Sequence, residues 1–226
     1  MAQAGVTTAE MDECAAQSIR DQGAQPSFLG YHGFPAHICV SINEEVVHGI
    51  PGPRRLADGD VVSIDCGAIV DGWHGDAART VLVGDVAPEL AELSRVTEES
   101  LWAGLAQAIP GNRLSDIGHA VESCVRSHGP HYGIVEEYVG HGIGSRMHME
   151  PAVPNYGRPG RGPRLVVGMA LAVEPMVVLG DAGVHTLDDE WTVVASDGSY
   201  ASHWEHTVAV TEDGPWVLTA LDDVRL

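Results

Sequence analysis

The chain has 226 residues, of which 44% are hydrophobic and 19% charged, so it is long enough to enclose one sizeable apolar core. Its 32 acidic residues outnumber 12 basic ones, all arginine, and the net charge of −20 disfavours unaided binding to nucleic acid. The four cysteines form no CxxC pair, which argues against a zinc knuckle and a secreted disulfide scaffold, and a reducing cytoplasm fits them best. Residues 1–8 lack the features of a secretory leader and no apolar run approaches membrane-spanning length, so we expect neither export nor membrane insertion.

Three helices are predicted from capping signals and apolar spacing. Thr7 and Glu10 form a capping box that opens a helix ending near residue 22, where a glycine follows. A second helix is predicted over 88–109, ahead of a Pro-Gly pair, and a third over 115–129. The segments Gly5–Gly23 and Gly111–Gly129 have the same length and similar ends, which is weak evidence for a duplicated helix-plus-sheet unit.

β-prone segments follow the helices in both halves of the chain, and this order is typical of the α+β class. The predicted β segments are 37–42, 46–51, a hairpin at 61–83, 136–139, 165–174, 176–179, 191–195, 203–210 and 216–218.

The predicted hairpin carries two carboxylates in a run that otherwise favours buried strand. Its apolar runs flank an Asp71-Gly72 turn signal, and folding at this turn brings Asp65 and Asp76 to directly opposed or diagonal positions. Two buried carboxylates repel each other unless a cation compensates them, so a shared metal ion is one interpretation. The other interpretation is an exposed edge hairpin with two solvated acids, and the hairpin sequence alone favours neither interpretation.

Three more residues shift the balance towards metal. His141 stands between glycines in GHGIG, where the backbone can approach a bound group closely, and histidine is a common metal ligand. Glu174 and Glu205 each lie in a β segment whose other residues predict a buried strand. Together with the hairpin aspartates they make four acids in core-like strands, which structural accident does not readily explain.

Four carboxylates and one imidazole suit a pair of bridged divalent ions, which in such sites lie about 3.5–4 Å apart and activate water for hydrolysis. Oxygen-rich ligation favours Mn²⁺, Fe²⁺ or Co²⁺, and Zn²⁺ remains open. The indicated reaction class is metal-assisted hydrolysis. His48 and His148 would then donate to a carbonyl oxygen or amide of the substrate as charge develops.

Five motifs occur in series along the chain: YHGFPAHICVSINEEVVHGIP (31–51), SIDCGAIVDGWHGDAARTVLVG (63–84), YVGHGIGSRMHMEP (138–151), LAVEPM (171–176) and WEHTVAVTEDG (204–214). The series resembles that of the type I methionine aminopeptidases, two-metal peptidases with the pita-bread fold. In this α+β fold, helices cover a curved antiparallel sheet built from pseudo-twofold halves. The resemblance runs from about Gly5 to Leu218 and implies a single peptidase domain over residues 1–226.

The resemblance also implies the roles of the site residues. The family's ligands of two divalent ions (Co, Mn, Fe or Zn) fall on Asp65, Asp76, His141, Glu174 and Glu205. Asp76 and Glu205 would bridge the ions, and Glu174 would also be a proton shuttle. His48 and His148 fall on the histidines that contact the substrate and its tetrahedral intermediate.

The implied activity is that of a methionyl aminopeptidase, which removes the initiator methionine from nascent proteins whose second residue is small. A metal-bridged hydroxide would attack the first peptide carbonyl. The implied partners are nascent N-termini, with at most a transient ribosome contact, and we expect a monomer that binds neither nucleic acid nor membrane. Soft and aromatic side chains would line the thioether pocket: Tyr31, Phe34, Cys39, Met147 and Trp191.

The sequence departs from the family pattern in three places. Bacterial members usually carry several tens of residues before the stretch that begins here at Gly5, so we expect their N-terminal helix and strand to be absent. Met147, Phe34 and His203 stand where other residues are more usual, which predicts an altered pocket shape or altered kinetics with the metal retained. We also expect no zinc-finger or Pro-rich N-terminal extension, so any ribosome docking would occur without that module.

Two alternatives stay open from the sequence. A prolidase-like enzyme would cleave Xaa-Pro bonds with the same metals, although such enzymes usually carry an extra N-terminal domain. A catalytically inactive pita-bread module would bind peptides or proteins, although such modules typically lose metal ligands. An activity assay would distinguish the three hypotheses, which predict methionine release, Xaa-Pro cleavage and neither activity.

Overall fold

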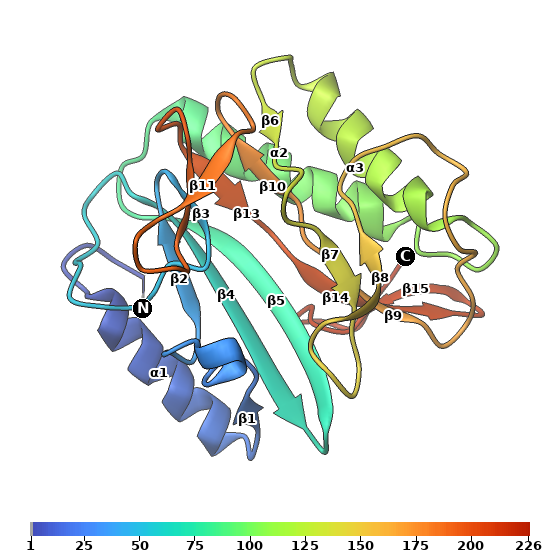
Figure 1. Cartoon of the computed structure of the whole chain (residues 1–226), viewed down its shortest axis with the longest axis horizontal. Coiled ribbons are helices and arrows are strands. Elements are labelled where there is room, and N and C mark those ends of the chain that lie inside the picture. Colours follow the sequence, from blue (N-terminus) through green and yellow to red (C-terminus); the bar gives the residue numbers. More distant parts are fainter. Residues whose placement is uncertain (1) are drawn as a thin grey trace.

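A computed structural model describes residues 2–226 and shows helices packed against antiparallel sheets (Figure 1). The helices are α1 (Thr8–Asp21), α2 (Pro88–Leu105) and α3 (Leu114–Ser127), and a 3₁₀ turn, η1, spans Tyr31–Gly33. Strands of both halves pair antiparallel throughout the described chain. The predicted α+β class is therefore confirmed.

The strands form four sheets. The four-stranded sheet contains β1 (Gln25–Pro26), β2 (Cys39–Ile42), β4 (Val61–Val70) and β5 (Trp73–Leu82). The six-stranded sheet has the order β16 (Val224–Arg225), β15 (Gly214–Val217), β14 (His206–Thr211), β9 (Ala170–Val173), β7 (Gly140–Gly142) and β8 (Met149–Val153). The two three-stranded sheets are β13 (Ala201–His203), β10 (Met176–Val178), β6 (Gly133–Ile134), and β11 (Val184–Thr186), β12 (Val193–Ala195), β3 (Glu45–Val47).

The predicted hairpin is present as β4 and β5, and it is the longest strand pair of the described chain. Asp71 and Gly72 form its turn with positive φ angles of 51° and 83°, a conformation that Asp and Gly tolerate. Gly67 pairs with Asp76, and Asp65 pairs with Ala78. The two aspartates are therefore diagonal neighbours on one face of the hairpin.

The predicted helix starts are confirmed, but the predicted second helix is too long at its C-terminal end. At the start of α1, the Thr7 hydroxyl accepts from the Glu10 N–H at 3.1 Å and the Glu10 carboxylate accepts from the Thr7 N–H at 2.7 Å, as a capping box requires. The prediction of helix to residue 109 was wrong, because α2 ends at Leu105 and the next residues form turns. Pro110 disfavours helical backbone at Ile109, and from Gln107 to Ile109 each N–H donates to a carbonyl only two or three residues back, so the last turn tightens before the proline.

Several β predictions were too long. Residues 136–139 form no strand, and β6 lies just before them; of 165–174 only Ala170–Val173 pairs in a ladder. The predicted strand 203–210 is interrupted at residues 204 and 205 between β13 and β14. Pro175 lacks the N–H that a ladder needs, so the chain is interrupted again between β9 and β10. Glu205 lies in the first interruption, which its apolar surroundings did not predict, and Glu174 lies at the second, beside the break that the predicted segments 165–174 and 176–179 already left at Pro175.

The two halves of the chain repeat one arrangement, as the matching segments suggested. α1 and α3 both have 14 residues, and an isolated antiparallel bridge precedes each of them, Thr7 with Arg55 and Arg113 with Arg164. In the second half α2 packs beside α3 and both cover the six-stranded sheet, whereas α1 lies alone beside β1 and β2 (Figure 1). Among residues 2–226, no helix is long and apolar enough to cross a membrane.

Candidate metal centre and substrate pocket

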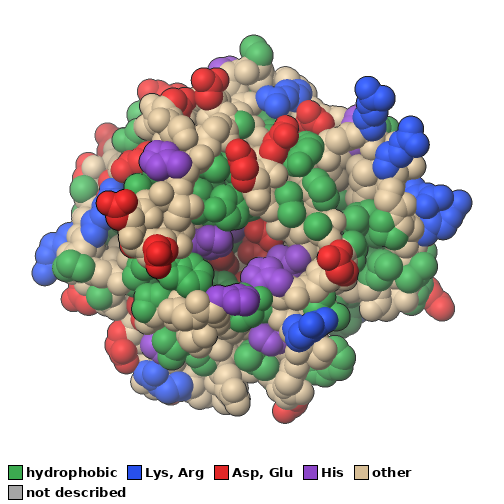
Figure 2. Space-filling model, in the orientation of Figure 1, with side chains coloured by type: hydrophobic (Ala, Val, Ile, Leu, Met, Phe, Trp, Pro, Cys, Tyr) green, Lys and Arg blue, Asp and Glu red, His purple; other side chains and the backbone are tan. Residues whose placement is uncertain are grey.

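A cavity of about 420 Å³ opens between the two halves. Figure 2 shows it as a hollow near the middle of one face, where histidine side chains surround buried acidic atoms. All twelve residues predicted for the site line it: Tyr31, Phe34, Cys39, His48, Asp65, Asp76, His141, Met147, His148, Glu174, Trp191 and Glu205. The structure therefore brings together residues that span 174 positions of the sequence from Tyr31 to Glu205.

Asp76 and Glu205 meet where the halves join. The backbone of Ala78 in β5 exchanges hydrogen bonds with that of Glu205, at 2.8 and 3.3 Å. Next to this pair, the Thr207 hydroxyl accepts from the Asp76 N–H at 3.0 Å and donates to the Asp76 carbonyl at 2.8 Å. These backbone contacts fix the two acids beside each other independently of their side chains.

The orientation of His141 leaves one ring nitrogen free for a ligand. Its Nδ1 lies 3.0 Å from the Gly142 carbonyl oxygen, and a carbonyl can only accept, so Nδ1 carries the proton. The lone pair is then on Nε2, which lies 3.5 Å from Glu174 Oε1. Donor atoms of His141, Asp76 and Glu205 all lie within 4.8 Å of one another, which is compatible with a shared metal ion.

The four carboxylates destabilise one another unless a cation joins them. Asp65 Oδ1, Asp76 Oδ1 and Glu205 Oε1 are buried without a hydrogen-bond partner. Burial raises the pKa of all four carboxyls, that of Asp76 to about 7, and repulsion from neighbouring carboxylates raises the other three further. Buried oxygens aimed at one place, with a free imidazole nitrogen among them, are the donor set that divalent metal ions require.

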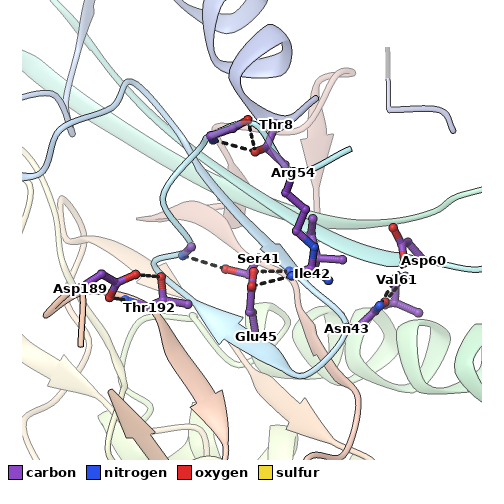
Figure 3. Close-up of polar contacts among 12 residues, drawn as sticks. Thr8, Ser41, Ile42, Asn43, Glu45, Arg54, Asp60, Val61, Asp189 and Thr192 are labelled. Carbon is purple, nitrogen blue, oxygen red and sulfur yellow. Dashed lines mark hydrogen bonds and ion pairs between the residues drawn. The ribbon is translucent and has the colours of Figure 1, made fainter. Parts of the chain in front are cut away.

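His48 is placed by the loop after β3. It adopts a left-handed backbone conformation, with φ of 61°, and the next N–H, that of Gly49, donates to the Ser41 hydroxyl at 3.1 Å. The Ile42 N–H donates to the Glu45 carboxylate at 2.8 Å, which closes the turn between β2 and β3 (Figure 3). Burial lowers the pKa of His48, so its ring is neutral near pH 7.

The other wall of the cavity is apolar. The Phe34 ring packs edge-on against Trp191 at 5.0 Å between centroids and against Phe28 at 6.5 Å. Cys39 and Met147 are buried in the same cluster. A soft aromatic and sulfur-lined wall beside a metal-ligand cluster suits a thioether side chain whose polar end faces the cluster.

Sequence reasoning missed two lining residues and underrated a third. Phe28 and His32 line the cavity; the glycines around residue 31 were the only available signal for them. His203 is almost fully buried, and its Nε2 has no hydrogen-bond partner and lies 3.9 Å from Glu174 Oε2. Burial lowers the pKa of His203 to about 3. His203 also borders a small second cavity of about 100 Å³ that adjoins His48.

Comparison with known proteins identifies the family. Residues 1–212 match the metallopeptidase family M24. The chain belongs to this family. It is 56% identical to the methionine aminopeptidase of Clostridium acetobutylicum, over 96% of this chain and 87% of that protein, and 56% identical to methionine aminopeptidase 1 of Mycobacterium tuberculosis, over 95% and 83%. The crystal structure of the Rickettsia prowazekii methionine aminopeptidase superposes with a TM-score of 0.94 at 41% identity, covering 97% of this chain and 88% of that one.

These similarities confirm the resemblance found in the five motifs. They support the predicted pita-bread fold and the enzyme class, a metal-dependent aminopeptidase that is a hydrolase. The prolidase of Pyrococcus horikoshii superposes with a TM-score of 0.74 at only 20% identity, covering 99% of this chain and 56% of that one, so it shares the fold alone. Neither the Xaa-Pro peptidase nor the inactive module is favoured, since the relatives at 50–56% identity are aminopeptidases by name and the five predicted ligand residues all line the cavity.

Proposed function

We propose that this chain removes the N-terminal methionine of proteins whose second residue is small. The observation that carries the proposal is a single cavity that joins the carboxylate and histidine cluster to the apolar wall of Phe34, Cys39 and Trp191. The cluster suits hydrolysis and the wall suits a methionine side chain. Relatives that are 50–56% identical carry the name methionine aminopeptidase, which supports the same assignment.

The cluster would hold two divalent ions, drawn from Co, Mn, Fe or Zn. Asp76 and Glu205 would bridge them, because carboxylate oxygens of the two residues lie within 4.8 Å of each other at the join of the two halves. Asp65 would complete the ligands of the first half, and His141 and Glu174 those of the second. Such ions supply activation of a water and polarisation of a peptide carbonyl.

The remaining side chains orient the substrate and move protons. His48 and His148 are neutral near pH 7: desolvation lowers the pKa of both rings, and at the rim of the cavity the neighbouring histidines help to lower that of His148 to about 4. Each ring can therefore donate a hydrogen bond to an oxygen that gains negative charge. Burial raises the pKa of the Glu174 carboxyl, so it is suited to take a proton from water and pass it to the leaving amine. Tyr31, Phe34, Cys39, Met147 and Trp191 would surround the methionine.

The substrates would be the N-termini of nascent chains in the cytoplasm. The net charge of −20 disfavours direct contact with ribosomal RNA, so any ribosome contact would be transient. We propose that the enzyme acts as a monomer, in which the residues of a single chain suffice to line the cavity. Binding to nucleic acid or to a membrane forms no part of the proposal.

The test is hydrolysis of Met-Gly-Met-Met beside Gly-Pro-Ala by protein stripped with chelator and reloaded separately with Mn²⁺, Fe²⁺, Co²⁺ or Zn²⁺. Methionine release that returns with metal, without cleavage of the proline peptide, is the expected result. It would also rank the four ions. Cleavage of the proline peptide alone would establish the Xaa-Pro alternative. Silence on both peptides from folded, metal-loaded protein would establish the inactive module.

A further inference from the structure

The His148 side chain is held by a residue from the opposite half of the molecule. His148 is exposed and lies in the bend between β7 and β8. Its Nδ1 lies 2.8 Å from the Tyr31 hydroxyl oxygen, across 117 positions of sequence, and the two rings are 5.3 Å apart. On its other side, the His148 ring lies 4.2 Å from the His141 ring. The contact with Tyr31 therefore fixes an imidazole that a bend would otherwise leave free to rotate.

Tyr31 is itself firmly placed. It opens η1, where its N–H donates to the Phe28 carbonyl at 2.9 Å and its carbonyl accepts from the Phe34 N–H at 2.9 Å. His32 adopts a left-handed conformation with φ of 49°, which is uncommon for a residue with a side chain, and its ring packs edge-on against Tyr31 at 4.4 Å. Backbone strain that the surroundings maintain at a binding cavity is typical of a positioned side chain. The turn thus presents the Tyr31 hydroxyl as a fixed group.

The chemistry of the two groups decides which one donates. Tyr31 has a single proton, and within residues 2–226 its hydroxyl has no acceptor other than the imidazole. A phenol O–H is a more acidic donor than the N–H of a neutral imidazole. Donation from the hydroxyl to Nδ1 is therefore the favoured arrangement, and it places the ring proton of His148 on Nε2. In this tautomer the Nε2–H of His148 remains available to donate a hydrogen bond to a ligand in the cavity.

We propose that Tyr31 is a positioning residue that selects the Nε2–H tautomer of His148 and fixes the ring as a hydrogen-bond donor to the reacting carbonyl. Tyr31 acts through His148 in addition to lining the methionine pocket. The inference rests on the proposed function for its catalytic consequence, but the tautomer is a property of the resting protein. It can therefore be tested without turnover.

The first test is ¹⁵N NMR of histidine-labelled, Zn²⁺-loaded protein at pH 7.5, with His148 assigned by the signal that disappears in His148→Gln. The expected wild-type spectrum has protonated Nε2 and unprotonated, hydrogen-bonded Nδ1. In Tyr31→Phe, which keeps the ring, a mixture of tautomers is expected, while Tyr156→Phe, outside the cavity, should match wild type. A protonated Nδ1 in wild type, or an unchanged tautomer in Tyr31→Phe, would overturn the proposal.

The second test is a double-mutant cycle. Tyr31→Phe should lower kcat about tenfold with KM within about twofold and unchanged bound metal, as expected for a residue that orients a catalytic group. In the His148→Gln background the same substitution should have no further effect. Full additivity of the two losses would show that Tyr31 acts independently and would overturn the proposal. A wild type that releases no methionine with any metal would refute the proposed function, and the NMR result would still decide the role of Tyr31.

Discussion

The two halves of the molecule supply their carboxylates in different ways. In the first half, Asp65 and Asp76 lie inside the continuous ladder of β4 and β5, on one face of a regular hairpin. In the second half, Glu174 and Glu205 lie where strands are interrupted, between β9 and β10 and between β13 and β14. The shorter aspartate side chains therefore extend from continuous strands, and the longer glutamate side chains extend from breaks between strands. Glu205 is nevertheless held against the hairpin by its backbone pair with Ala78, so the hairpin positions acids from both halves.

The largest expected effect comes from removing one bridging acid of either half. Asp76→Asn and Glu205→Gln keep the size of the side chain but remove the charge, and each should lower kcat/KM by more than about 1,000-fold, because the activation of water is lost. Peptide hydrolysis and metal analysis of both variants would measure it. Substantial turnover in either variant would refute the bridging assignment.

The hairpin acids should oppose the stability of the metal-free protein. The pKa of Asp76 is raised from 3.8 to about 7 by burial, so the native state binds more protons than the unfolded state between these values. Metal-free wild type therefore loses stability from this residue as the pH rises from about 4 to about 7. Metal-free Asp76→Asn lacks that loss, and its stability relative to wild type should grow by about 4 kcal/mol over this range.

Denaturant unfolding of both metal-free proteins across the pH range would measure this difference. Saturation with metal should make wild type more stable than Asp76→Asn, because only wild type keeps its bridging ligand. Parallel stability curves from pH 4 to 8 would mean that Asp76 is solvated in the absence of metal.

His148 tests whether the second half contributes catalysis as well as ligands. His148→Ala should lower kcat about 100-fold, as loss of one donor to a developing oxyanion does, with little change in bound metal. Steady-state kinetics and metal analysis on the same preparation would check it. Equal loss of activity and metal would make His148 a ligand.

The smallest effect probes the packing of the hairpin itself. A Cβ at Gly67, opposite Asp76, would meet the Phe28 ring at 2.7 Å and the Ser27 Cβ at 2.8 Å, whereas one at Gly75 meets only a Thr219 methyl at 3.8 Å. Gly67→Ala should therefore cost about 1–3 kcal/mol of stability by overpacking, and Gly75→Ala should change it by less than about 0.5 kcal/mol. Thermal unfolding of the pair would measure the difference. Equal stability of the two variants would mean that the residues around Gly67 shift at little cost to accommodate a Cβ.

The sequence predicted much of this architecture because the hairpin signals are local. The apolar runs of the hairpin, the Asp71-Gly72 turn and the capping box at Thr7 are recognised from neighbouring residues, and the hairpin, its turn and the capping box were found as predicted. The strand interruption at Glu205 was not predicted, because the Glu205 backbone pairs with Ala78 across the join of the two halves. The contact of Tyr31 with His148 could not be predicted either, because it joins residues 117 positions apart in the sequence.

If acids from both halves share two metal ions, the ions must lie close enough to couple magnetically. Electron paramagnetic resonance of protein loaded with two equivalents of Mn²⁺ measures this coupling. We expect an exchange-coupled pair in wild type, and its loss in both Asp76→Asn and Glu205→Gln. A spectrum of isolated, uncoupled Mn²⁺ at full occupancy in wild type would contradict a shared two-metal site.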